Sequence, residues 1–166
     1  SECLTILTMN TKYSSPSFQR GFQWTEQLID TFTLLINQGA DLTSPEFVNA
    51  KDCDERTALH CVAIRISEKL DEADILLPLL NYLTILENVN TKDCYERTVL
   101  HYLAKGISLK PDAADKILPF ISDFTTPENV NVKDCDEMTV LHYLAKGISE
   151  KPDTADKLLP LIYDLT

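Results

Sequence analysis

The stretch Val130-Asn131-Val132-Lys133-Asp134-Cys135 decides the fold, because it repeats a stretch that begins at Val89 and another that begins at Val48. Each copy begins 41 residues after the one before it. Residues 130–166 are identical to residues 89–125 at 28 of 37 positions, which include surface as well as core positions. A repeat of this length predicts a stack of similar units, since one unit cannot bury its apolar face alone.

Each unit is predicted to contain a turn, a helix, a loop and a second helix. Thr57, Thr98 and Thr139 precede apolar stretches of helical period, where a hydroxyl group can cap the first backbone amides. In the first helix of the middle unit, Leu100, Leu103 and Ala104 share one face. The pattern therefore predicts an all-α solenoid of paired antiparallel helices, joined by hairpin-like loops.

The second helix contains two prolines in each of the last two units and one proline in the unit before them. Pro111 and Pro152 lie near its start, where proline is tolerated. Pro78, Pro119 and Pro160 lie further along, and there we expect a kink or a break into shorter pieces. The apolar residues of this helix in the last two units are Ala114, Ile117, Leu118 and Ile121, then Ala155, Leu158, Leu159 and Ile162.

The motif Val-Asn-x-Lys-Asp followed by Thr-x-Leu-His resembles the ankyrin repeat. Three copies in register carry this resemblance, with His60, His101 and His142 at the motif histidine. The resemblance implies a structural histidine that hydrogen-bonds neighbouring turns. It also implies one domain over residues 1–166, with repeats at 48–88, 89–129 and 130–166 and a divergent first repeat at 1–47. The chain starts at Ser1 and ends partway through a repeat, so we expect a piece of a longer protein.

The repeats also depart from the family pattern. The family repeat is near 33 residues, and the extra length here is expected between the helices and in the exit loop. Glu55, Glu96 and Glu137 replace a glycine at the tip of the turn. Because glycine adopts conformations that other residues resist, we expect hairpins that are shorter or differently shaped.

Composition narrows the class of function. The net charge is −11, which disfavours nucleic acid and anionic membranes as partners. It would attract a partner protein with a basic patch, or it only keeps the protein in solution. No apolar run reaches the 18 or so residues that span a bilayer. Five cysteines without a compact framework indicate reduced thiols and a cytoplasmic protein.

The sequence offers no convincing enzyme signature. Each full unit holds a cysteine and a histidine seven residues apart, beginning with Cys53 and His60. Successive pairs would lie about 10 Å apart, so four ligands would not converge on one metal ion, nor would disulfides form between units. Phosphate-binding loops and nucleophile elbows are absent from the sequence. We therefore expect no catalysis, no cofactor, no metal and no small-molecule substrate.

The resemblance implies that a partner protein binds to the hairpin tips and to the exposed face of the first helices. Tyr95 is notable because it replaces an aspartate, and Met138 replaces an arginine; drift on a solvated loop is the alternative. The positions that match the variable contact sites of the family, apart from Cys53, Cys94 and Cys135, are Lys51, Asp54, Arg56, Ile64, Arg65, Lys92, Tyr95, Arg97, Lys105, Lys133, Asp136, Met138 and Lys146.

Three hypotheses for function remain open at this point. The chain is a protein-binding scaffold, or the targeting module of a larger bacterial or viral effector or toxin that binds a host protein in the host cytoplasm or nucleus, or a self-associating array. In the second case any catalysis lies in another domain. Residues 10–23 form a polar insertion that is followed by Trp24. It is interpreted either as a recognition element or as a cap over the end of the stack.

Overall fold

The computed structural model describes residues 50–86 and 89–164, and every regular element within these ranges is helical. The predicted first repeat at 1–47 and its insertion lie outside the described residues. This part of the chain is therefore all-α, as the sequence predicts. Its helices, with short 3₁₀ segments marked η, are α4 (Ala58–Glu68), η2 (Leu70–Glu72), α5 (Ala73–Leu86), α6 (Val99–Leu109), η3 (Pro111–Lys116), α7 (Leu118–Phe124), α8 (Val140–Glu150), η4 (Pro152–Thr154) and α9 (Ala155–Asp164).

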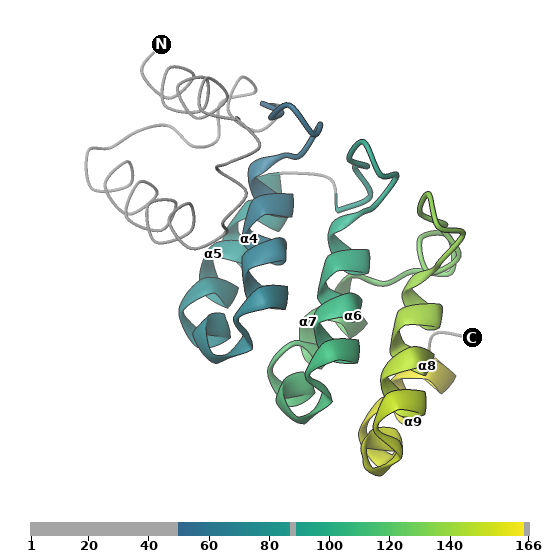
Figure 1. The fold of residues 1–166 in the computed structure, drawn as a ribbon. Helices are drawn as coiled ribbons and strands as arrows, with labels where there is room; N and C mark the ends of the chain where they lie inside the picture. The colour runs from purple at the N-terminus through teal and green to yellow at the C-terminus, as the bar shows by residue number, and fades with distance from the viewer. Residues whose placement is uncertain (1–49, 87–88, 165–166) are drawn as a thin grey trace, which may run out of the picture. The chain divides into compact units, whose positions relative to one another are not determined.

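Contacts divide the chain into a unit that ends at Ala58 and a compact unit from Leu59 to Thr166. In the second unit α6 and α8 have equal lengths and lie one repeat apart in sequence. Figure 1 shows α4, α6 and α8 as a row of first helices, each with its second helix behind it. We call each such pair, with the turn before it, a layer. The repeated sequence thus forms repeated layers in which neighbours lie side by side.

The first helices approach one another closely at a glycine. A Cβ atom built on Gly106 would lie 2.7 Å from the Cα atom of Ser67 in α4. One on Gly147 would lie 3.0 Å from the Cα atom of Ser108 in α6. Real Cβ atoms essentially never come within 3.0 Å of another heavy atom, so α4 and α6 can pack at this distance only because Gly106 has no side chain.

The core lies between the two helices of each layer and between successive layers. Leu100, Leu103 and Ala104 are completely buried, which confirms the predicted face of the first helix. On the second helix of the last layer, Leu158 and Leu161 are buried and Leu159 is exposed. Ala114, Ile117 and Phe120 follow a spacing of three, a period that also suits the 3₁₀ segment before α7. In α5 the buried residues Leu76 and Leu80 are four apart.

The interior prolines act differently in different layers. Pro119 lies in the first turn of α7, directly after η3. A proline at that position removes no helical hydrogen bond, because the first amides of a helix have no partner in it. The predicted break is therefore confirmed in this layer. In α5 and α9 the helix continues through Pro78 and Pro160.

The tip turns adopt a left-handed backbone at a glutamate. The φ angles of Glu55, Glu96 and Glu137 are 59°, 56° and 60°. Each turn is closed by two backbone hydrogen bonds; in the last layer Glu137 N–H donates to Asp134 O and Asp134 N–H donates to Met138 O. This is the pattern of a three-residue hairpin loop with a left-handed residue. The glutamate thus adopts a backbone conformation that favours glycine, because the surrounding hydrogen bonds hold it there.

Replacing Glu137 by glycine should stabilise the fold. Glycine reaches positive φ without a steric penalty, and we expect the free energy of unfolding to rise by about 0.5–1 kcal/mol. The lost ion pair with Lys133 is exposed and contributes little. Urea denaturation should show this gain for Glu137→Gly but not for Glu137→Ala, which removes the same carboxylate and keeps the strain. An equal gain for both variants would contradict the role assigned to the backbone.

Among the described helices, none is long and apolar enough to cross a membrane.

Candidate partner-binding site

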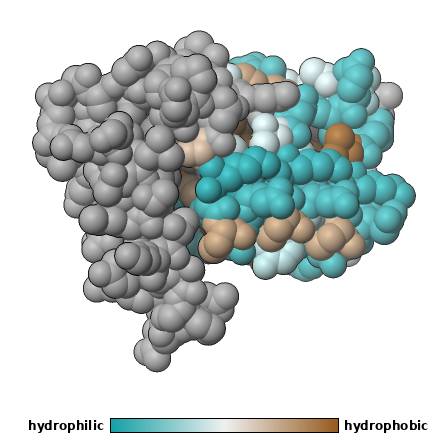
Figure 2. Space-filling view, turned by 90° about the horizontal axis from the view of Figure 1, so that it is seen from above, coloured by the Kyte–Doolittle hydropathy of each residue, from teal (hydrophilic) through white to brown (hydrophobic). Residues whose placement is uncertain are grey.

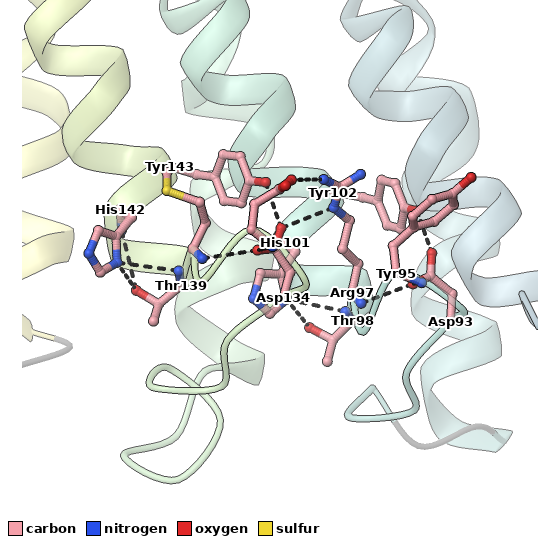
Figure 3. A network of polar contacts seen from close by, with 12 residues as sticks. Asp93, Tyr95, Arg97, Thr98, His101, Tyr102, Asp134, Thr139, His142 and Tyr143 are labelled. Carbon is pink, nitrogen blue, oxygen red and sulfur yellow. Dashed lines mark hydrogen bonds and ion pairs between the residues drawn. The ribbon is translucent and has the colours of Figure 1, made fainter.

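The tip turns of the last two layers are each organised by a buried aspartate. Asp134 Oδ1 accepts hydrogen bonds from the backbone N–H groups of Asp136 at 3.0 Å and Met138 at 2.9 Å. Its Oδ2 accepts one from the Tyr143 hydroxyl at 2.8 Å. Asp93 makes the same set of contacts in the middle layer, to its own turn and to Tyr102. The motif aspartate therefore joins the tip turn to the first helix of its layer (Figure 3).

Arg97 joins the tips of neighbouring layers. Its Nε donates to Asp134 Oδ2 at 3.0 Å, and its Nη2 donates to Asp136 Oδ2 at 2.7 Å. The guanidinium group also lies 5.5 Å from the centre of the Tyr95 ring, within the range of a cation–π contact. A backbone bond from Cys135 N–H to Tyr95 O, 3.0 Å long, runs between the same two tips. These contacts hold the Tyr95 turn against the following layer.

The motif histidines bond to the layer that follows. His60 Nε2 lies 3.2 Å from Arg97 O, and His101 Nε2 lies 3.0 Å from Val132 O. The Thr98 N–H group donates to His101 Nδ1 at 3.1 Å, so Nδ1 is the acceptor and Nε2 carries the proton. His101 thus takes the place of the usual glutamate in a capping box at the start of α6. The structural role implied for these histidines is confirmed for His60 and His101.

Burial and hydrogen bonding change the pKa values of this network. Burial would raise the pKa of Asp134, but hydrogen bonds from Tyr143, Arg97 and the two turn amides lower it. Burial and the bond to Asp134 raise the pKa of Tyr143 to about 12. Burial would lower the pKa of Arg97, yet the bond to Asp134 and the surrounding charges raise it. Near neutral pH the network therefore holds a carboxylate, a neutral phenol and a guanidinium cation.

The stability of the fold should fall as the pH is lowered through the range in which histidine titrates. Burial lowers the pKa of His101 below its usual value. The unfolded chain therefore binds the proton more readily than the folded chain, and the free energy of unfolding rises with pH in this range. Urea denaturation at several pH values between 7.5 and 5 gives the free energy of unfolding as a function of pH. This free energy should change less steeply with pH for His101→Gln than for the unmodified chain. Equal slopes would exclude His101 as a source of the dependence.

The predicted contact residues differ widely in exposure. Arg65 is buried at 1% exposure and forms an ion pair with Glu72 in its own layer, so it is not available to a partner. The resemblance predicted it as a contact because its position matches a variable contact site, but it occupies the position of Gly106 and Gly147, which lie against the preceding first helix. The exposed members are Lys51, Lys92, Tyr95, Lys133, Asp136 and Lys146, and the half-buried ones are Asp54, Arg56, Ile64, Arg97, Lys105 and Met138.

The charged members are largely neutralised by ion pairs. Lys92 and Lys133 each pair with the glutamate four residues later, at 3.2 and 2.6 Å. Lys146 lies 3.8 Å from Glu150. In the unit that ends at Ala58, Lys51 and Arg56 pair with Glu55 and Asp54. The tips therefore present paired charges rather than a strongly acidic or basic surface, and Figure 2 shows them as a mainly hydrophilic face with hydrophobic groups along one edge.

On the first helices, one exposed large apolar residue was not predicted as a contact. Leu109 at the end of α6 is 62% exposed, one helical turn beyond Lys105. Glu68 and Glu150 occupy its position in the flanking layers. Tyr95 was predicted because it differs from the residues at its position in the flanking repeats, and the same comparison would have predicted Leu109. The middle layer thus exposes a tyrosine and a leucine where both of its neighbours carry acidic residues.

Exposed thiols and one depression bear on the possible chemistry of the described residues. Within residues 50–86 and 89–164, no group of three or more histidine, cysteine, aspartate or glutamate side chains is placed to hold a metal ion. The thiols of Cys53, Cys94 and Cys135 are exposed on the tips. A depression of about 290 Å³ lies near the last layer, lined by Thr125, Thr126, Pro127, Val130, Asn131, Leu141 and Asp164. This lining contains one carboxylate and no nucleophile–base pair.

Comparison with known proteins adds no relative: no protein-family model matches the chain, and neither does any curated protein.

Proposed function

We propose that this chain is an ankyrin-type repeat domain that binds a partner protein through its tip turns and the exposed side of its first helices. The observation that carries the proposal is the middle layer, where Tyr95 and Leu109 are 42% and 62% exposed. Binding hot spots are enriched in tyrosine and arginine, and Arg97 lies against the Tyr95 ring. Both flanking layers carry acidic residues at these two positions.

The way in which these side chains are held also favours binding. Arg97, Asp134 and the bond between Cys135 and Tyr95 fix the tip of the middle layer against the next one. A surface that is already ordered loses little conformational entropy when a partner binds. The tips would therefore act as a rigid display, and recognition would depend on which side chains each turn presents.

Substituting Tyr95 should weaken capture of the partner. If Tyr95 is a hot spot, Tyr95→Ala should reduce affinity by roughly thirtyfold, equivalent to about 2 kcal/mol. Quantitative affinity capture from cell lysate, followed by titration of the captured protein, measures this loss. Leu109→Ala tests the far end of the same layer in the same way.

Substitutions of exposed residues outside the proposed binding surface serve as matched controls. Tyr163 on α9 and Ile75 on α5 are 73% and 68% exposed on second helices. Tyr163→Ala and Ile75→Ala should leave capture unchanged, and circular dichroism should show equal helix content in all four variants. If these control substitutions reduce capture and Tyr95→Ala does not, the partner binds to the second helices and the proposal fails.

A further inference from the structure

The last layer exposes positions that are buried in the two layers before it. Leu59 and Leu100 are completely buried, and so are Ile66 and Ile107. The corresponding residues of the last layer, Leu141 and Ile148, are only half-buried. Seven residues of α8 and α9 have lost the cover that their counterparts have, and we call them the end face: Leu141, His142, Ala145, Ile148, Ser149, Ala155 and Ile162.

The earlier layers show what covers these positions. Ser67 and Ser108 each receive the glycine of the next first helix, Gly106 and Gly147. Ser149 is their counterpart on the end face, and it is exposed. By analogy with α8 packed against α6, the helix that fits against α8 is one with a glycine opposite Ser149.

The motif histidines also differ between the last layer and the two layers before it. His60 and His101 each place Nε2 against a backbone carbonyl oxygen of the next layer. His142 is held by the same contacts to Thr139 at Nδ1, but its side chain is exposed. A partner on the end face that supplies a carbonyl oxygen at this point would complete the third bond of the series.

The charges repeat in the same way on the second helices. Lys116 Nζ pairs with Asp74 of the preceding layer at 2.5 Å, and Lys157 Nζ pairs with Asp115 at 2.6 Å. Asp156 is the next aspartate of this series, and it is exposed beside the end face. A lysine is therefore the complementary charge for an element that covers α9.

We infer that the end face is a docking site for a further helix pair of the same pattern, with a glycine on its first helix and a lysine on its second. The glycine lies against Ser149, the lysine pairs with Asp156, and a carbonyl oxygen of the preceding turn accepts from His142. This surface is distinct from the tips and first-helix sides proposed for the partner protein. The occupant is identified by three contacts that the middle and last layers make with each other. The end face and Asp156 present the same groups for a further layer.

The test extends the chain after Thr166 with a second copy of residues 126–166. Within this copy, Gly147, Lys157 and Val132 carry the three contacts. An Asp136→Glu change in the copy separates its peptides from those of the original layer by mass. Carbethoxylation of His142, followed by peptide mass analysis, should slow by roughly tenfold or more, because a buried ring reacts only through local opening. His60 and His101, which are already buried, serve as internal references.

A matched extension carries Gly147→Arg in the copy and should leave His142 as reactive as in the original chain. Circular dichroism at 222 nm should show added helix for the glycine extension. If His142 stays reactive in the glycine extension, or is protected equally by the arginine extension, the inference is wrong. Protection of His142 in the original chain that grows with protein concentration would instead identify a second copy as the occupant and overturn the proposal. None of these results depends on capture of the partner protein.

Discussion

Asp134→Ala is expected to lower the free energy of unfolding by about 3 kcal/mol. The Asp134 carboxylate is completely buried and accepts hydrogen bonds from Arg97, Tyr143 and two turn amides. Removing it leaves a largely buried guanidinium group and a buried hydroxyl group without their main acceptor. It also removes the bonds that hold Glu137 at positive φ, so the turn and the contact between layers are lost together.

Urea denaturation of Asp134→Ala and Asp136→Ala provides the comparison. Asp136 also pairs with Arg97, at 2.7 Å, but its side chain is 64% exposed. Exposed ion pairs contribute little, so Asp136→Ala should cost less than about 1 kcal/mol. Similar losses for the two variants would mean that the network contributes only as a surface ion pair and not through burial.

Gly106→Ala should destabilise the fold by about 2 kcal/mol, although alanine is the better helix former by about 1 kcal/mol. The added Cβ would lie 2.7 Å from the Cα atom of Ser67 and 3.3 Å from its carbonyl oxygen. These are backbone atoms, so no side-chain rotation relieves the clash and α4 must move away from α6. The expected sign is opposite to the one that helix propensity alone predicts.

Gly147→Ala is the matched control, because the same residue type lies at the same position of the next layer. Its Cβ would lie 3.0 Å from the Cα atom of Ser108 and 3.5 Å from a methyl group of Leu158. We expect its unfolding free energy to lie within about 1 kcal/mol of the unmodified chain, since propensity and crowding nearly cancel. Thermal denaturation measures the stability of both variants. Equal stability of Gly106→Ala and Gly147→Ala would contradict the packing argument.

The features that the sequence predicted correctly are those that depend on period. Leu100, Leu103 and Ala104 share a face at helical spacing, and Pro111 and Pro152 begin the 3₁₀ segments before α7 and α9. The helix cap at Thr139, whose hydroxyl accepts from His142 N–H, was also predicted from the pattern. Each of these features depends on residues close together in the chain, so a single copy of the repeat is enough to predict it.

The features that the sequence did not predict depend on contacts between layers. Arg65 was predicted to be a contact residue on α4, and only the packing shows that it is buried and paired with Glu72. The positive φ of Glu137 depends on the bonds that Asp134 makes to the turn. Leu159 is exposed because Leu158 and Leu161 form the buried side of α9. The Tyr95 site was predicted from its difference to the flanking repeats, and that reasoning extends to Leu109.

The glycine contact also fixes the order of the repeats. Copies that are so alike in sequence would seem to be interchangeable by recombination. A shuffled gene that placed the Ala58–Leu86 helix pair between the other two would set Arg65 against the serine of the preceding helix, where only a hydrogen atom fits. Duplication of either later copy avoids this collision. The array can therefore lengthen by copies of its later helix pairs, whereas the Ala58–Leu86 pair cannot be placed after a first helix that carries this serine.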